Sequence, residues 1–405
     1  MLTRPPVAVF AMPERGHFNR LRPLISGLAD ADVAAYVFTD QRFKEEVQAA
    51  GGRFVDLFAG HPIEGADATS IPVPCRYVSF AGHYADQVVR QVAPLRPGLV
   101  IHDTFAVIGV VVANHLGVPR VNVCSGHNFA PAPTEESLGR PHVHVSEECW
   151  HAVRALRERH GLSEATPFSF VSTLSPDLNV YCEPPEFLRV EERQAFEPIV
   201  FFGSLPAPRR DEETVRASPF GDGAGRKLRI YASFGTVVWR YYEAEALSAL
   251  EACGEAVAGV SDAVALVSLG GAASRDRAAR LARRNVRVEN YVDQWNVLRE
   301  ALFFLTHHGL NSTHEAIFHQ TPMISYPFLS DQPALAKRCQ ELGLAVPLVE
   351  ALRGPVAPRD VGSALDRVAA QRGDLQARLA EARCWELETI RGRKAVIERI
   401  IDLAR

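Results

Sequence analysis

The chain has 405 residues, of which 47% are hydrophobic and 23% charged, and its formal net charge is −4. Single hydrophobic cores stop growing near about 250–300 residues, so we expect two domains. The ordinary composition argues against a collagen-like or disordered chain, and the lack of a basic surplus argues against nucleic-acid binding.

Several features concern the cellular location. The longest apolar stretch, Phe105–Ala113, is about half the length that a membrane-spanning helix requires, so we expect no membrane span. The first residues do not resemble a secretory signal. The seven cysteines are scattered without a C-x-x-C pair, which is typical of reduced thiols. These features together predict a cytoplasmic protein.

The first half of the chain alternates short apolar runs with segments of helical periodicity. The predicted strands are Val7–Ala11, Val33–Phe38, Phe54–Leu57, Leu99–His102 and Arg120–Val123. Helices are expected around Leu21–Leu28, over Phe43–Ala50 and over Phe105–Leu116, whereas Ala59–Arg76 is expected to be irregular. Strands separated by single helices predict parallel β-α-β units.

The second half repeats this pattern. The predicted strands are Leu228–Ser233, Ala263–Ser268, Val286–Glu289, Leu302–Thr306 and Met323–Tyr326, and the predicted helices are Ala244–Val257, Asn311–His319 and Asp331–Leu342. The chain from Val361 onward is expected to be helical, with an amphipathic end. The fold class is therefore predicted as α/β, with two Rossmann-like, doubly wound domains that face a cleft.

The predicted domain boundaries follow from composition. Residues 1–205 form the first domain, and residues 206–226, rich in proline, glycine and charge, form a linker. The second domain is expected over 227–385, followed by a helix over 386–405 that crosses back to the first domain.

The segment after the strand Leu302–Thr306 has the features of an anion site. The strand ends in His307-His308-Gly309, and the next helix opens near Asn311-Ser312. The free N–H groups of a helix N-terminus bind anions, most often phosphate. Glu315 lies one turn further, where a carboxylate can accept from two vicinal ribose hydroxyls. Asp331-Gln332 supplies acceptors and donors for sugar hydroxyls.

This segment resembles the nucleotide-binding signature of the family-one glycosyltransferases: W-x-P-Q, T-H-G-G-x-N-S-x-x-E-A, G-V-P-M and D-Q. The matching strings are Tyr291-Val292-Asp293-Gln294, Thr306 to Ala316 (THHGLNSTHEA), Gln320-Thr321-Pro322-Met323 and Asp331-Gln332. Ser233-Phe234-Gly235-Thr236 resembles the family's S-F-G-S/T loop. The donor-binding residues that the resemblance implies are Ser233, Gly235, Thr236, Tyr291, Val292, Gln294, His307, Gly309, Asn311, Ser312, Glu315, Asp331 and Gln332.

The departures from the signature bear on the donor site. His308 replaces a family glycine, so the loop has to tolerate a side chain beside the phosphates. Tyr291 and Asp293 replace the base-stacking Trp and the Pro. Either Tyr291 or the nearby Trp295 is then the base-stacking residue.

A second resemblance follows the first strand. The string Gly16 to Leu24 (GHFNRLRPL) is similar to the family's G-H-x-N-P-x-L-x-L, with Arg20 where a Pro is common. In the family this histidine, here His17, is the general base, and a helix N-terminus favours its neutral form. Asp103 resembles the last Asp of D-x-V-x-x-D and would orient His17. Helix capping or simple packing is the alternative for both side chains.

The resemblance implies a GT-B fold and inverting, metal-independent sugar transfer. The partners would be a UDP- or TDP-sugar bound by the second domain and a small hydrophobic, antibiotic-type natural product bound by the first. Segment 71–84 and the histidine-rich segment 126–151 would shape the acceptor pocket. No cofactor is expected, and the protein would be a monomer or homodimer.

Two alternative functions remain open from the sequence. A sugar-nucleotide 2-epimerase has a similar two-domain plan but needs no acceptor pocket. A non-catalytic auxiliary protein of a glycosyltransferase would be expected to lose His17, Asp103 or Glu315, all of which are present. The histidines of segment 126–151 lie near Glu147, Glu148 and Cys149, but their spacing matches no standard zinc site.

Overall fold

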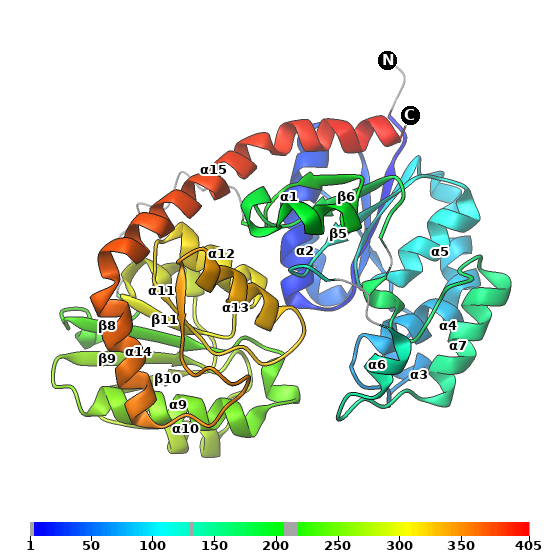
Figure 1. Cartoon of the computed structure of the whole chain (residues 1–405). Coiled ribbons are helices and arrows are strands. Elements are labelled where there is room, and N and C mark those ends of the chain that lie inside the picture. The colour runs from blue at the N-terminus through cyan, green and yellow to red at the C-terminus, as the bar shows by residue number, and fades with distance from the viewer. Residues whose placement is uncertain (1–3, 130–132, 173, 206–217, 405) are drawn as a thin grey trace. The chain divides into compact units, whose positions relative to one another are not determined.

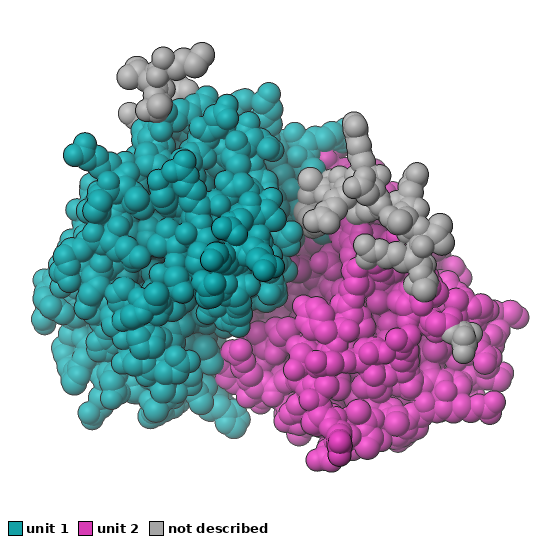
Figure 2. Space-filling view, turned by 180° about the vertical axis from the view of Figure 1, so that it is seen from behind, with its two compact units in different colours: residues 1–207, 389–405 teal, residues 208–388 magenta. Residues whose placement is uncertain are grey.

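The computed structural model describes residues 4–129, 133–172, 174–205 and 218–404. It contains two compact units, shown in different colours in Figure 2. Unit 1 comprises residues 1–207 and 389–405, and unit 2 comprises 208–388. Most of the predicted linker, 206–217, lies outside the described residues. No helix in the described part of the chain is long and apolar enough to cross a membrane.

Unit 1 is built on a seven-stranded parallel sheet of order β3-β2-β1-β4-β5-β6-β7 (Figure 1). Its strands are β1 (Val7–Phe10), β2 (Ala35–Thr39), β3 (Arg53–Asp56), β4 (Leu99–Asp103), β5 (Arg120–Cys124), β6 (Leu178–Tyr181) and β7 (Ile199–Phe201). Every residue of β1 and β4 is buried, as expected for central strands covered on both faces.

The helices of unit 1 are α1 (Arg15–Asp30), α2 (Lys44–Ala49), α3 (Ile63–Ala66), α4 (Cys75–Val92), α5 (Val107–Leu116), α6 (Thr134–Leu138), α7 (Glu147–Arg159) and α8 (Val190–Arg193). Two of the longer ones, α4 and α7, were not predicted from the sequence pattern. The expectation that Ala59–Arg76 is irregular was wrong in part, since this segment contains α3 and the start of α4. Helix α4 lacks a side-chain N-cap and follows Pro74, so no start signal marked it.

Unit 2 contains a six-stranded parallel sheet of order β10-β9-β8-β11-β12-β13. Its strands are β8 (Leu228–Ser233), β9 (Ala263–Ser268), β10 (Val286–Glu289), β11 (Phe303–Thr306), β12 (Met323–Ser325) and β13 (Ala345–Pro347). Its helices are α9 (Glu243–Ala258), α10 (Arg275–Leu281), α11 (Gln294–Glu300), α12 (Leu310–Phe318), α13 (Gln332–Glu341), α14 (Pro358–Ala370) and the first part of α15 (Arg372–Leu403). The predicted helix from Val361 is in fact two helices, separated at Gln371.

The two sheets share one strand order. In each sheet, the first strand of the unit lies between the second and the fourth. The strands that follow β1 are added on one side of it and those that follow β4 on the other, so the strand order reverses between β1 and β4. The same reversal occurs between β8 and β11. Ligands of doubly wound sheets bind at the carboxyl ends of strands at such reversal points. The predicted α/β class with two doubly wound parallel sheets is confirmed.

The C-terminal residues 389–405 belong to unit 1. In this part of α15, Ile397, Ile400 and Ile401 are buried. The Arg393 guanidinium donates to the carbonyls of Phe202 and Leu205, at 2.8 and 2.6 Å. The end of α15 is thus part of the core of unit 1.

This packing predicts a stability effect. Replacing Ile400 with Ala should lower the free energy of unfolding by about 2–5 kcal/mol, because the truncation removes apolar burial and leaves a cavity. Urea unfolding measures the change. The control is Arg399→Ala at the exposed neighbouring position, expected to change it by less than about 0.5 kcal/mol. Equal effects from both variants would contradict the packing.

Candidate active site

In unit 1, the reversal point between β1 and β4 brings His17 and Asp103 together. His17 lies in the first turn of α1, which follows β1, and Asp103 is the last residue of β4. Nδ1 of His17 is 2.9 and 3.0 Å from the two carboxylate oxygens of Asp103. An ionised carboxylate only accepts, so Nδ1 carries the proton and Nε2 keeps a lone pair. The pair therefore holds the imidazole in the tautomer that a general base requires.

The Asp103 carboxylate is fully buried. Burial alone would raise its pKa, but the charge and hydrogen bonds of His17, the Ser125 hydroxyl and the Phe105 N–H outweigh it and lower the pKa. The Phe105 N–H donates to Asp103 at 3.1 Å. Helix α5 begins at Val107, four residues after Asp103, with Ala106 at its N-cap. Asp103 is therefore not the N-cap of α5, and its main polar partner is His17.

Two residues next to the His17–Asp103 pair have packing roles. The Phe105 ring stacks on His17, with centroids 4.0 Å apart, and so supports the imidazole plane. His102, one residue before Asp103, is buried in the sheet, and burial lowers its pKa to about 3. It is neutral near pH 7 and packs against Gly109 of α5, where a Cβ would lie 2.6 Å from its own.

In unit 2, the corresponding reversal point between β8 and β11 holds His307 between two glycines. A Cβ at Gly235 would lie 2.7 Å from His307 Nε2, and a Cβ at Gly309 would lie 2.5 Å from it. Gly235 also has φ +69°. Burial lowers the pKa of His307 to about 4, against the opposing effect of a hydrogen bond with the Ser233 backbone. The ring is thus neutral, and its buried Nδ1 has no partner within the described chain.

A third glycine loop was missed by sequence reasoning. Gly270, just after β9, has φ +56°, and a Cβ there would lie 2.1 Å from the carbonyl oxygen of Gly235. The loops after β8 and β9 therefore meet backbone to backbone, and the His307 ring connects the loop after β11 to Gly235. The Gly270-Gly271 pair directly after a predicted strand was the available signal.

His308 has a left-handed backbone conformation, which glycine adopts most readily. Its φ is +59°, and its side chain is fully buried. Its Nε2 is 2.8 Å from the Ser325 hydroxyl and its Nδ1 is 3.2 Å from the Thr313 hydroxyl. Gln320, at the other departure from a family glycine, is similar, with φ +56°. Both residues that replace a family glycine thus have a left-handed backbone.

Helix α12 and the start of α11 place several predicted donor residues together. The Gln294 amide donates to Glu315 at 2.7 Å and to the Ser312 hydroxyl at 3.1 Å. The Tyr231 hydroxyl in β8 donates to the side-chain oxygen of Gln294 at 3.2 Å. Burial raises the pKa of Glu315 to about 7, although the Gln294 hydrogen bond opposes this. Asn311, in the first turn of α12, is also half-buried.

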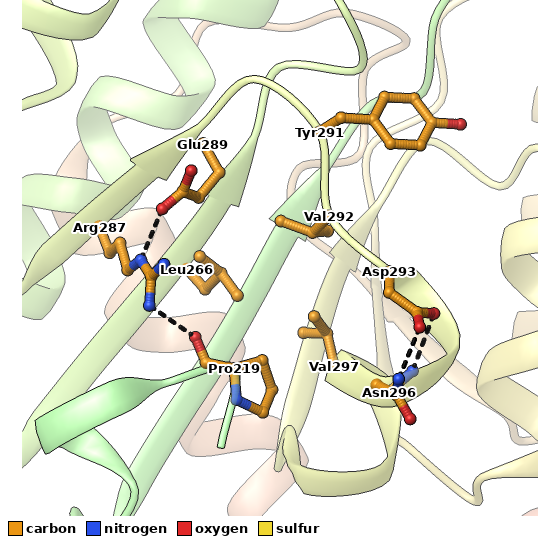
Figure 3. Close-up of a pocket in the computed structure, with 9 residues that line it drawn as sticks. All are labelled: Pro219, Leu266, Arg287, Glu289, Tyr291, Val292, Asp293, Asn296 and Val297. Carbon is orange, nitrogen blue, oxygen red and sulfur yellow. Dashed lines mark hydrogen bonds and ion pairs between the residues drawn. The ribbon is translucent and has the colours of Figure 1, made fainter. Parts of the chain in front are cut away.

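The segment between β10 and α11 forms one wall of a pocket (Figure 3). Tyr291 is 62% exposed, and in Figure 3 its ring points away from Arg287 and Glu289. Trp295 instead packs against Phe318, with ring centroids 4.8 Å apart. Trp295 is therefore a packing residue, and Tyr291 is the ring open to a ligand. The pocket is lined by Pro219, Leu266, Arg287, Glu289, Tyr291, Val292, Asp293, Asn296 and Val297.

The remaining predicted donor residues lie at or beyond the carboxyl ends of the strands of unit 2. Ser233 is the buried last residue of β8, and Thr236 is exposed in the following loop. Asp331 is the N-cap of α13. The Gln332 side-chain oxygen accepts from two backbone N–H groups of the preceding loop, at 3.0 and 3.3 Å, so this oxygen is committed to the loop itself.

The other polar clusters do not form a metal centre in the described part of the chain. His127 pairs with Glu183 at 2.8 Å, and both side chains are buried. The histidine-rich segment 126–151 contains α6 and the start of α7, which carries His151. An Asp-x-Asp triplet, Asp30-Ala31-Asp32, lies at the end of α1 remote from His17.

Comparison with known proteins shows a similarity to glycosyltransferases. Residues 188–372 match the model described as UDP-glucoronosyl and UDP-glucosyl transferase, and this segment includes the donor-site residues above. Over this segment the chain is similar to that glycosyltransferase family.

Individual relatives extend the match beyond that segment. The chain is 24% identical over 351 residues to the uncharacterized UDP-glucosyltransferase YdhE of Bacillus subtilis (strain 168), covering 83% of this chain and 84% of the relative. Its structure matches the crystal structure of the glycotransferase of kitacinnamycin with a TM-score of 0.77 and 21% identity, over 98% and 100% of the two chains. It matches the spinosyn rhamnosyltransferase SpnG complexed with thymidine diphosphate with a TM-score of 0.66 and 16% identity, over 96% and 99%. These structural matches establish the GT-B fold.

The buried His308 predicts an order of stability among variants. His308→Ala leaves two buried hydroxyls without their partner and should lower the free energy of unfolding by about 2–4 kcal/mol. His308→Gly loses the same bonds but relieves the left-handed backbone, so it should cost about 1 kcal/mol less than Ala. Thermal and urea unfolding of both variants test this order. An alanine variant as stable as the glycine variant would contradict it.

Proposed function

We propose that the protein is an inverting glycosyltransferase in which His17 is the general base and Asp103 its orienting partner. The observation that carries this proposal is the His17–Asp103 pair at the reversal point of the first sheet, which leaves His17 Nε2 able to accept a proton. Nε2 removes the proton of the acceptor hydroxyl as its oxygen attacks the anomeric carbon. The bond from that carbon to the diphosphate breaks, and the configuration inverts. The buried Asp103 stabilises the imidazolium that forms.

The proposed donor is a nucleoside-diphosphate sugar bound to unit 2. The N-terminus of α12 and the neutral His307 would face the diphosphate, whose charge grows as it leaves. Tyr291 would stack on the base beside the Val292 backbone, and Glu315 with Gln294 would bind the sugar of the nucleoside. Dipoles and neutral donors of this kind can stabilise the charge of the transition state without a metal ion. We therefore include metal independence in the proposal.

The nature of the nucleoside is open to a structural argument. Glu315 can accept from two vicinal hydroxyls, as uridine offers, whereas thymidine carries only the 3′ hydroxyl. YdhE is named for UDP, and SpnG was solved with thymidine diphosphate. We therefore propose both donors as candidates, with Glu315 contributing more to the binding of a UDP-sugar.

The proposed acceptor is a small hydrophobic natural product bound to unit 1. Around His17, Phe105 lies 5.4 Å from Phe170 and 6.1 Å from Tyr77 between ring centroids. Aromatic surface of this kind suits an apolar acceptor that presents a hydroxyl to the base. Kitacinnamycin and spinosyn in the names of the structural relatives point to the same acceptor class.

The base assignment has a direct test. His17→Ala should lower kcat by at least about 100-fold, because it removes proton transfer, and leave the affinity for UDP near that of the natural chain, since the donor site lies in unit 2. His307→Ala should instead weaken the binding of UDP. Transfer to a panel of aromatic and macrocyclic acceptors and calorimetric titration with UDP give the two readouts.

Two outcomes would contradict the proposal. Full transfer activity in His17→Ala would rule out His17 as the base. Conversion of UDP-glucose into an epimer by the natural chain, without any acceptor, would instead indicate the epimerase.

The raised pKa of Glu315 predicts a pH dependence of donor binding. Below about pH 7 the carboxyl is protonated, so affinity for UDP-glucose should rise as the pH increases through 7 and the stronger acceptor forms. UDP-glucose is the right probe because its diphosphate has no ionisation near neutral pH. Glu315→Gln should bind more weakly at pH 8 and show no such rise, with a smaller loss for TDP-glucose. Calorimetric titration at pH 6 and pH 8 measures the change, and a rise that persists in Glu315→Gln would contradict the assignment.

A further inference from the structure

Ser125 connects Asp103 to a second point on helix α1. Ser125 follows β5 directly and is buried, with 2% of its surface exposed. Its hydroxyl donates to Asp103 Oδ1 at 2.5 Å, while its next acceptor, the Val123 carbonyl, is 3.3 Å away. The bond therefore goes to the carboxylate oxygen that also faces His17.

Arg20 closes the connection from the other side. It lies one turn after His17 on α1, and its side chain is buried. Its guanidinium donates to the backbone carbonyl of Ser125. His17, Asp103, Ser125 and Arg20 thus form a closed set of contacts from α1 through β4 and the end of β5 back to α1.

We infer that Ser125 and Arg20 are positioning residues of the proposed base: Arg20 fixes the Ser125 backbone, and the Ser125 hydroxyl fixes the Asp103 carboxylate that sets the proton affinity of His17. This inference rests on the proposed role of His17. It also gives a reason for the departure at Arg20, where the family commonly has a proline. A proline has no side chain that could reach the Ser125 carbonyl.

The physical effect of the Ser125 bond has a definite sign. A hydroxyl that donates to a carboxylate stabilises its charge and lowers its basicity. Without that donor, Asp103 would attract the proton on His17 Nδ1 more strongly and stabilise the imidazolium further. The pKa of His17 should therefore rise when the hydroxyl is removed.

The surroundings limit which other charges act on this pair. Arg20, on α1, contacts the Ser125 carbonyl and acts electrostatically on Cys182. Among the described residues, His102 on β4, Cys124 on β5 and Cys182 after β6 interact electrostatically with Asp103, and burial keeps all three neutral near pH 7. Glu183 and Arg393 act on Cys182 from farther along the same edge. A shift in His17 after a change at Ser125 therefore reports on Asp103.

The test measures the pKa of His17 directly by NMR in histidine-labelled protein. His17→Gln identifies its signal among the 14 histidines. Ser125→Ala should raise the pKa by about half a unit or more, and Ser125→Thr, which keeps the hydroxyl, should leave it near the natural value. Arg20→Lys keeps the positive charge but loses the planar donor, so it should shift the pKa in the same direction by less.

The double variant separates a linked pair from two independent effects. If Arg20 acts through the Ser125 hydroxyl, Arg20→Lys should add little in a Ser125→Ala background. In transfer assays, Ser125→Ala should lower kcat by about 10-fold with KM for UDP-glucose unchanged, and the acid limb of the pH profile should move up with the pKa.

An unchanged or lowered pKa of His17 in Ser125→Ala would overturn the inference, as would a shift of equal size in Ser125→Thr. The NMR measurement needs no turnover. A raised pKa in a protein whose His17→Ala variant remains fully active would support the positioning contacts and contradict the proposed function, so the two failures are distinguishable.

Discussion

The reversal of strand order at β1/β4 and again at β8/β11 is the constraint on which both candidate sites depend. Where neighbouring parallel strands continue in opposite directions, no crossover covers their carboxyl ends, and the loops there remain open to a ligand. In unit 1 this places His17 beside Asp103 although 86 positions separate them in sequence. In unit 2 it places the Gly235 loop against His307. The same topological rule thus positions the proposed proton-accepting pair in one unit and the proposed diphosphate-facing loop in the other.

The sequence predicted the sheet strands well where they were continuous apolar runs between turn residues. Strands β8, β9 and β10 have their predicted bounds, whereas β6, β7 and β13 were not predicted. At the sites, motif spacing indicated His17 and Asp103, but Ser125 carries no local signal, because its role depends on β5 lying next to β4. The choice between Tyr291 and Trp295 depended on where α11 begins, since that decides which ring faces the core.

The polar groups of unit 2 act mainly as dipoles. His307 and His308 are neutral near pH 7 because burial lowers their pKa. Burial raises the pKa of Glu315 to about 7, so its carboxyl group is partly protonated near neutral pH. The N-terminus of α12 supplies a partial positive charge without a fixed cation. A near-neutral chain with a net charge of −4 is compatible with binding an anionic ligand, because the required potential is local.

The cysteines of this fold have a practical consequence. Six of the seven thiols are buried, and Cys384 on α15 is exposed. Burial raises the pKa of Cys75, Cys124, Cys149, Cys182 and Cys253, which suppresses the thiolate that reacts with alkylating reagents. The natural chain therefore offers one accessible attachment point for a fluorophore or spin label. That point lies on the helix that belongs to both units, five residues before Thr389, where the chain passes from unit 2 into unit 1.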